Sequence, residues 1–290
     1  MTTGAASRYS YVLSTLLAID AIAASAASLA RPDLIHGPSV SVGSLRGTAL
    51  VILVVAVPIL LASMALVRRG SLLALVGWIG ALGYISYQGV LFLFGSPFNG
   101  LFFLYLGILS FGVWSLIAIV PGLPVAEFGA QFGPRTPVRL VAAYLAILAA
   151  LFYLLWLRAI VPALFDSVAP AFLVGTGMTT GPGQILDLGF ALPVVVASAV
   201  LIWRRRPWGY LLGGSMLVML AIESVSIGVD QWFGSVADPS STVVSAAMVP
   251  VFAAIAAIGL VVFGVYLRGV RRDTRSGSTR PLVIAEPPRS

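Results

Sequence analysis

Eight runs of mainly apolar residues follow one another along the chain, and they limit its fold more than any other feature. Each run has about 20 residues, the length that an α-helix needs to cross the ~30 Å hydrocarbon core of a bilayer. Turn-forming segments such as RPDLIHGP, FGSPFNG and ADPSS separate the runs. We predict an all-α membrane protein, an eight-helix transmembrane bundle, with spans at residues 9–30, 47–67, 71–94, 100–120, 138–161, 187–203, 208–229 and 244–267.

The composition of the chain also indicates a lipid environment. Hydrophobic residues make up 59% of the chain and charged residues 9%. A soluble domain has about 45–50% apolar and about 25% charged residues. A chain with so few charges lacks the polar groups that would cover a surface in water, so its first expected partner is the lipid bilayer.

Several residue types are missing, and their absence excludes whole classes of site. All 17 basic residues are Arg, Cys does not occur, and His36 is the single histidine. The chain therefore lacks the ligands of an iron–sulfur cluster or a bis-His haem, and the lysine of a retinal Schiff base. We predict no cofactor, no metal site and no catalytic residue. We do not expect an enzyme, although hydrolysis by a pair of carboxylates stays open.

The arginines lie at the ends of the apolar runs, and their distribution predicts the orientation of the chain by the positive-inside rule. With the N-terminus inside, fourteen of them face the cytoplasm and three, Arg31, Arg46 and Arg158, face outside. Both termini are then cytoplasmic, and anionic lipid headgroups are the expected partner of that face. The same clustering accounts for the pI near 10.2, so we expect no nucleic-acid partner.

The first run also has a second interpretation. Its Arg-bearing start and its end in small residues, ASAASLA, resemble a secretory signal peptide. The run is long for a signal, however, and Asp20 interrupts it. We expect a retained first span, and cleavage would leave seven spans.

Two parts of the chain resemble each other. Pro58 opens PILLASMALVRR and Pro193 opens PVVVASAVLIWRRR, so Pro, Ala-Ser and the arginines recur at a spacing of 135, with one residue inserted before the arginines. We predict two parallel four-helix repeats related by a pseudo-two-fold axis along the membrane normal. The alternative is chance similarity between stretches rich in Ala, Leu and Val. The predicted divisions are a first half at 1–120, a cytoplasmic connecting loop at 121–137, a second half at 138–267 and a disordered basic tail at 268–290.

Glu223 is the most unusual residue of the seventh run. A charged carboxylate that faced lipid would cost at least ~2.5–3.5 kcal/mol, so we expect this side chain to face the interior of the bundle. Ser226 and Asp230 follow at three and seven residues and share its helix face. These three residues form a polar stripe along the seventh run.

Partners for this glutamate are present on other runs. Tyr84 and Gln88 lie at a similar depth on the third run, and Arg158 lies near the outer end of the fifth. Two states of the glutamate stay open at this point. One is a neutral acid that is hydrogen-bonded to Tyr84 or Gln88, and the other is an ion pair with Arg158.

Two more acids complete the candidate polar site. Asp187 lies at the outer start of the sixth run, and Asp20 lies near the middle of the first. Glu223 itself lies about 22 Å along the helix axis from Trp208, at 1.5 Å per residue. Most of these residues therefore fall in the outer half of the membrane, which predicts a cavity open to the outside.

Two stretches resemble a known group of proteins. LDLGFALPVVVASAVLIWRRRPWGYLL, with LGYISYQGVLFLFGSPFNGLFFLYLG upstream, is similar to a group of uncharacterised multi-pass bacterial membrane proteins. The resemblance covers most of the chain and implies a bacterial cytoplasmic membrane. It brings no activity and no site residue with it.

Three functional hypotheses follow from these observations. The leading one is a carrier or sensor for a small solute, ion or proton that enters from the outer face. The second is a non-catalytic packing or assembly partner of other membrane proteins, whose identities the sequence does not indicate. The third is a membrane enzyme that acts on a lipid-linked substrate.

Overall fold

The computed structural model describes residues 7–166 and 168–270. Eight of its helical stretches are long and apolar enough to cross a membrane, which confirms the predicted number of spans. A first group consists of α1 (Arg8–Ala30), α2 (Ser39–Val51), α3 (Val57–Arg68), α4 (Leu75–Phe94) and α5 (Phe102–Ile119). After the short α6 (Val125–Ala130), a second group consists of α7 (Val138–Asp166), α8 (Pro182–Leu186), α9 (Leu192–Trp203), α10 (Pro207–Ala237) and α11 (Val249–Arg268).

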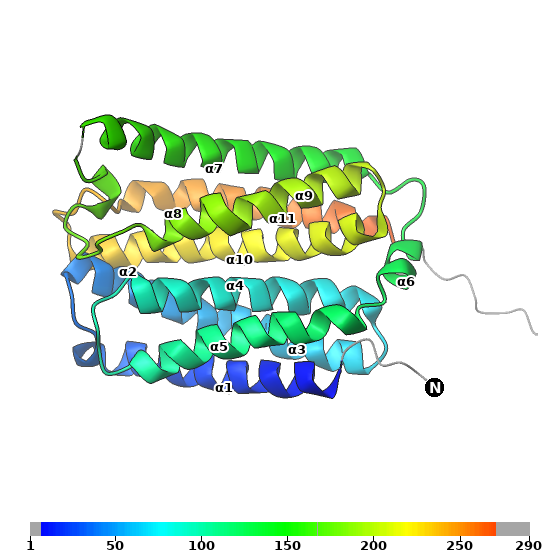
Figure 1. Ribbon diagram of the computed structural model, residues 1–290, viewed down its shortest axis with the longest axis horizontal. Coiled ribbons are helices and arrows are strands. Elements are labelled where there is room, and N and C mark those ends of the chain that lie inside the picture. The colour runs from blue at the N-terminus through cyan, green and yellow to red at the C-terminus, as the bar shows by residue number, and fades with distance from the viewer. Residues whose placement is uncertain (1–6, 167, 271–290) are drawn as a thin grey trace, which may run out of the picture.

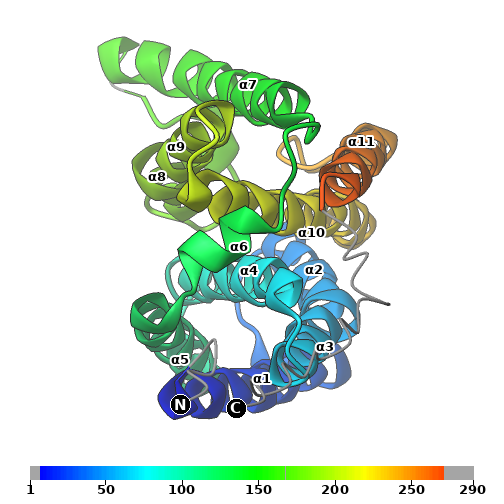
Figure 2. The ribbon, with the colours of Figure 1, turned by 90° about the vertical axis from the view of Figure 1, so that its right-hand side faces the viewer.

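Helix α10 is the centre of the bundle. It packs against α9 and α11 of its own group and against α2 and α4 of the first group. Figures 1 and 2 show the two groups one above the other, with α10, α4 and α2 at their boundary and with α1 and α7 at the two outer sides. One end of the bundle faces the viewer in Figure 2, and we call it the basic end because its helices begin or stop at or next to an arginine, namely Arg8, Arg68, Arg139, Arg204 and Arg268.

Several helices extend beyond the predicted spans at the end opposite the basic end. Helix α2 begins at Ser39 where the prediction was 47, and α10 continues to Ala237 where it was 229. In these extensions the sequence becomes less apolar while the helix continues, so a limit drawn from hydropathy alone falls short. Arg46, which we expected before the second span, therefore lies within α2.

The structure describes the predicted connecting loop but only the first three residues of the predicted tail. Residues 121–137 contain α6, which packs on the start of α10. An isolated β-bridge joins Phe132 to Val270 and holds this segment beside the end of α11. Beyond Val270, the predicted basic tail lies outside the described residues.

The second span of each group contains a π-helical segment. These segments are Ile52–Ala56, between α2 and α3, and Asp187–Ala191, between α8 and α9. Pro58 and Pro193 follow at the second residue of the next helix. Because proline has no backbone N–H, the carbonyl four residues earlier loses its α-helical partner, and that carbonyl lies inside the π segment in both spans.

The same two spans end in the same turn. The N–H groups of Gly70 and Ser71 donate to the carbonyl oxygens three and five residues earlier, at 2.9 and 3.0 Å. Those of Arg205 and Arg206 do the same, both at 2.9 Å. This pattern is a Schellman motif, which places Gly70 (φ 91°) and Arg205 (φ 53°) in the left-handed region. Corresponding residues of the two turns are 135 apart in the sequence, the same spacing as Pro58 and Pro193.

Glycines bring α2 close to α10. A Cβ atom added at Gly43 would lie 2.6 Å from the carbonyl oxygen of Phe233, and one at Gly47 would lie 2.9 Å from that of Val229. Glycines four residues apart let helix backbones approach each other in membranes. This contact joins the two groups near the end opposite the basic end.

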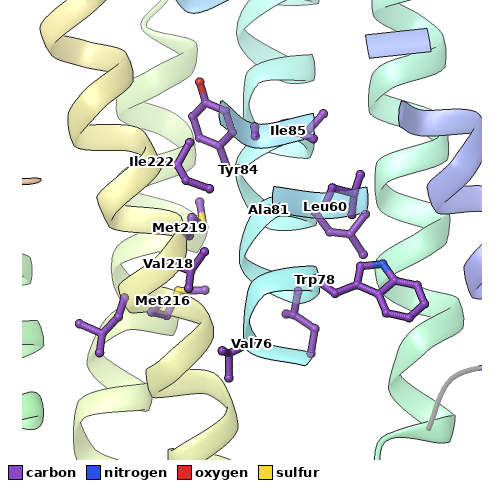
Figure 3. Close-up of a cluster of buried hydrophobic side chains, with 14 of the residues drawn as sticks. Leu60, Val76, Trp78, Ala81, Tyr84, Ile85, Met216, Val218, Met219 and Ile222 are labelled. Carbon is purple, nitrogen blue, oxygen red and sulfur yellow. The ribbon is translucent and has the colours of Figure 1, made fainter. Parts of the chain in front are cut away.

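Large side chains fill the boundary between α4 and α10 (Figure 3). Tyr84 of α4 is fully buried and lies beside Ile222 and Met219 of α10. Trp78, also fully buried, points away from α10, and its Nε1–H donates to Ser14 Oγ of α1 at 3.0 Å. Helix α4 is therefore packed on both sides, and it positions its polar residues rigidly against α10.

A buried tyrosine ties α11 to α10 near the basic end. The hydroxyl of Tyr266 donates to the carbonyl oxygen of Tyr210 at 2.9 Å. Tyr266→Phe removes this bond and should lower the free energy of unfolding by about 1 kcal/mol. Thermal unfolding in detergent measures the change, with Tyr9→Phe as the control because Tyr9 is 76% exposed. Equal melting of the two variants would contradict this role of the Tyr266 hydroxyl.

Candidate functional site

Glu223 contacts the first group of helices directly. The side chain lies on α10, 16 residues after Pro207 and 14 before Ala237, so it is close to the midpoint of that helix. It is partly buried, and its Oε2 atom accepts a hydrogen bond of 2.8 Å from Nε2–H of Gln88, which is 2% exposed. Of the partners predicted for this glutamate, Gln88 is the one that the structure provides.

A second hydrogen bond joins the same two helices next to the first. The hydroxyl of Tyr84 donates to Oγ of Ser226 at 2.8 Å, and both side chains are buried. Ser226 lies one turn beyond Glu223 on the predicted polar stripe. Tyr84, one of the two donors predicted for the glutamate, therefore donates its hydrogen bond to Ser226 instead.

Asp187 is held by two aromatic donors. Its Oδ1 accepts a hydrogen bond of 3.1 Å from the hydroxyl of Tyr87, and its Oδ2 accepts one of 2.8 Å from the indole N–H of Trp156. Asp187 is the first residue of the π segment, Tyr87 lies on α4 and Trp156 lies on α7. Because Tyr87 precedes Gln88 on α4, one short stretch of that helix binds both carboxylates. We call Glu223, Gln88, Asp187, Tyr87 and Trp156 the carboxylate cluster.

Sequence reasoning missed the role of Trp156 and left Tyr87 outside the candidate site. Tryptophans near span ends are common at the membrane–water interface, so the fifth run gave no signal that this one binds an acid. Tyr87 is adjacent to Gln88 and faces a different side of α4. The neighbouring π segment, which reaches across to it, is not visible in the hydropathy pattern.

The other candidates lie apart from the cluster. Arg158 is exposed on α7, and the single salt bridge among residues 7–166 and 168–270 joins Arg31 to Asp33. The predicted ion pair between Arg158 and Glu223 is therefore not formed in this part of the chain. Asp20 faces α5, where a Cβ added at Gly107 would collide with its Oδ2.

Asp230 shares the stripe of Glu223 but faces α2. A Cβ added at Gly47 would lie 3.0 Å from the Cα atom of Asp230, so the two backbones are in contact. Its Oδ1 atom is buried and has no hydrogen-bond partner within the described residues. The polar stripe thus serves two interfaces, with Glu223 and Ser226 facing α4 and Asp230 facing α2.

The charge of the carboxylate cluster is not balanced by a basic side chain in the described structure. Its two acids accept hydrogen bonds from an amide, a phenol and an indole, all of them neutral donors. Such donors orient carboxylates without neutralising them, so the cluster is suited to a proton or a small cation. No group of three or more His, Cys, Asp or Glu side chains in the described ranges could hold a metal ion.

A double-mutant cycle tests whether Trp156 binds Asp187. In Asp187→Asn the side chain keeps one acceptor oxygen for two donors, so one donor loses its partner. Trp156→Phe combined with Asp187→Asn should therefore show a coupling free energy of about 1 kcal/mol in thermal unfolding. Trp114→Phe is the matched control, because Trp114 is 60% exposed, and it should add to Asp187→Asn without coupling. Additivity in both pairs would contradict the hydrogen bond.

Comparisons with known proteins do not extend this picture. No protein-family model matches the chain, and searches among curated proteins and solved structures also find no match. The resemblance stated from the sequence is therefore without an identified family. Eight candidate spans establish the chain as a multi-pass membrane protein that contacts the lipid bilayer.

Proposed function

We propose that the protein is a carrier or sensor whose carboxylate cluster binds a proton or a small cation that enters from the end opposite the basic end. The observation that carries this proposal is the pairing of Glu223 and Asp187 with neutral donors only, at the boundary between two helix groups. A structural role alone would be served by uncharged partners, which avoid the cost of placing an acid inside a membrane.

The position of the cluster supports this proposal. In many carriers the coupling ion binds near the bilayer midplane, between two repeats and beside an interrupted helix. Glu223 binds Gln88 across the boundary between the two helix groups, and Asp187 begins a π segment. Local π segments inside helices are frequent at functional sites.

Duplication of a four-helix unit accounts for the frame around the cluster. The π segments, the prolines after them and the Schellman turns all recur at a spacing of 135 residues. We therefore propose two parallel repeats, at 1–120 and 138–267. At this spacing Asp187 corresponds to Ile52, and both residues begin a π segment. The first π segment forms with isoleucine at this position, so the π segment itself does not require an acid. Asp187 is therefore better explained by a function than by the fold.

The arginines support a cytoplasmic basic end. Of the twelve arginines in the described residues, nine lie at the basic end and three lie toward the other end, as the positive-inside rule requires for a bacterial cytoplasmic membrane with the basic end inside. In this orientation the ion reaches the cluster from the outside. Anionic headgroups of the inner leaflet are then the expected partners of the basic end.

Charge displacement on a solid-supported membrane tests the proposed function without knowledge of a solute. Proteoliposomes receive a rapid change of pH or of Na⁺ concentration, and a charge that binds within the membrane produces a transient current. We expect a current for the wild-type protein and for Asp166→Asn, a control acid that is exposed at the end of α7. No current with either ion would favour the packing or assembly partner instead.

A further inference from the structure

A basic pocket lies at the basic end of the second helix group, away from the carboxylate cluster. The cavity has a volume of about 410 Å³, and Arg135, Arg139 and Arg205 line it together with Thr136 and Trp203. It lies where the chain enters α7, whose N-terminal N–H groups add positive partial charge. The pocket thus combines three guanidinium groups with a helix N-terminus.

An apolar groove continues from this pocket into the membrane. Its volume is about 370 Å³, and it is lined by Ala142, Ala143 and Ala146 of α7, by Ala199 and Val200 of α9, and by Trp203 and Arg204 at the basic end. Trp203 lines both the pocket and the groove, so the two are adjacent. Helices α7 and α9 pack against each other along this line, at the outer side of the bundle in Figure 2.

The backbone of Arg205 is strained in a way that serves the pocket. In the corresponding turn of the first group the left-handed position holds Gly70, the residue that adopts this conformation without cost. Arg205 takes the same conformation at a steric cost, and its Nη2–H donates to the carbonyl oxygen of Thr136 at 3.4 Å. A charged residue at a position that glycine would occupy without strain points to a role for its guanidinium at this place.

The arginines of the pocket are not paired with acids in the described structure. The salt bridge between Arg31 and Asp33 is the single one within residues 7–166 and 168–270. The guanidinium of Arg139 instead stands 5.8 Å from the ring centroid of Trp203. This contact places a positive charge at the mouth of the groove.

We propose that the pocket and groove bind one anionic phospholipid from the leaflet at the basic end. The phosphate lies among Arg135, Arg139 and Arg205, and one acyl chain lies along the alanines between α7 and α9. Arginine matches phosphate geometry with two parallel hydrogen bonds. Basic pockets between membrane helices are suited to such headgroups. This site is independent of the proposed function and names a specific place for the lipid contact.

Arg205→Gly provides a sharp test because it separates stability from binding. Glycine relieves the left-handed strain, so the variant without lipid should melt at the same temperature as the wild-type protein or higher. Phosphatidylglycerol should raise the melting temperature of the wild-type protein in neutral detergent by a few degrees, as a ligand of the folded state does. The affinity of Arg205→Gly for this lipid should be about tenfold lower, the loss of one charge-assisted hydrogen bond.

Three control measurements distinguish an anionic phospholipid from free phosphate and from a nonspecific lipid effect. Phosphatidylcholine and inorganic phosphate at equal ionic strength should give no shift, and Arg268→Gln, a basic-end arginine outside the pocket, should bind phosphatidylglycerol as the wild-type protein does. Native mass spectrometry counts the retained lipid. The proposal is overturned if Arg205→Gly binds phosphatidylglycerol normally, if phosphatidylcholine acts equally, or if inorganic phosphate alone gives the full shift.

Discussion

Replacing Glu223 by glutamine is expected to abolish the charge displacement that follows a pH or Na⁺ change, while the protein stays folded. Glutamine keeps the shape of the side chain and retains an oxygen that can accept the hydrogen bond from Gln88. In the wild-type protein this bond to Glu223 is 2.8 Å long. It removes the group that binds a proton or carries the negative charge. The melting temperature should therefore stay close to that of the wild-type protein, and the transient current should be lost.

Gln88→Leu is the companion variant for this experiment. It removes the donor and leaves the glutamate in place, so the current should persist with a changed dependence on pH while the melting temperature falls. A hydrogen bond to a charged group contributes about 1.5–3 kcal/mol. If Glu223→Gln keeps the wild-type current and the wild-type melting temperature, Glu223 is only a link between α10 and α4, and the packing role gains support.

Replacing Gly47 by leucine is expected to cause the largest loss of stability. A Cβ at this position would lie 2.9 Å from the carbonyl oxygen of Val229 and 3.0 Å from the Cα atom of Asp230. Both are backbone atoms, so a rotamer change cannot relieve the contact and α2 must move away from α10. Overpacking of a close-packed site costs about 1–3 kcal/mol or more, and this site joins the two helix groups.

Gly264→Leu is the matched control for this substitution. It places the same side chain on α11, where an added Cβ has no atom within 4 Å. Thermal unfolding in detergent and the amount of folded protein in membranes should fall for Gly47→Leu and stay unchanged for Gly264→Leu. Equal behaviour of the two variants would contradict the close contact between α2 and α10.

The apolar runs predicted the eight spans because bilayer thickness sets a minimum length for each helix. Bilayer thickness does not set where a helix ends, however, so the predicted spans were shorter than the helices. Where a helix passes out of the hydrocarbon region, polar residues are tolerated while backbone hydrogen bonds continue. Residues 39–46 of α2 and 230–237 of α10 lie in such extensions. They include Gly43, so the close contact between α2 and α10 escaped sequence reasoning.

The candidate site was predictable in part, and the reason differs between its two acids. Glu223 and Gln88 lie on long regular helices at similar depth. Helical spacing and the cost of an intramembrane acid were therefore enough to predict that the two side chains are in contact. The partners of Asp187 depend on a π segment and on how far α7 lies from α4. Neither follows from periodicity, because both are set by the packing of whole helices. Trp156 therefore became visible only in the folded chain.

The most direct measurement of the proposed site is infrared difference spectroscopy of the reconstituted protein between acidic and alkaline pH. Binding of a proton converts a carboxylate to a carboxylic acid, which has a separate C=O stretching band. We expect such a band in the wild-type protein, its retention in Asp166→Asn, and the loss of one component each in Glu223→Gln and Asp187→Asn. A spectrum that is the same in the wild-type protein and in both cluster variants would contradict the binding of a proton at this cluster.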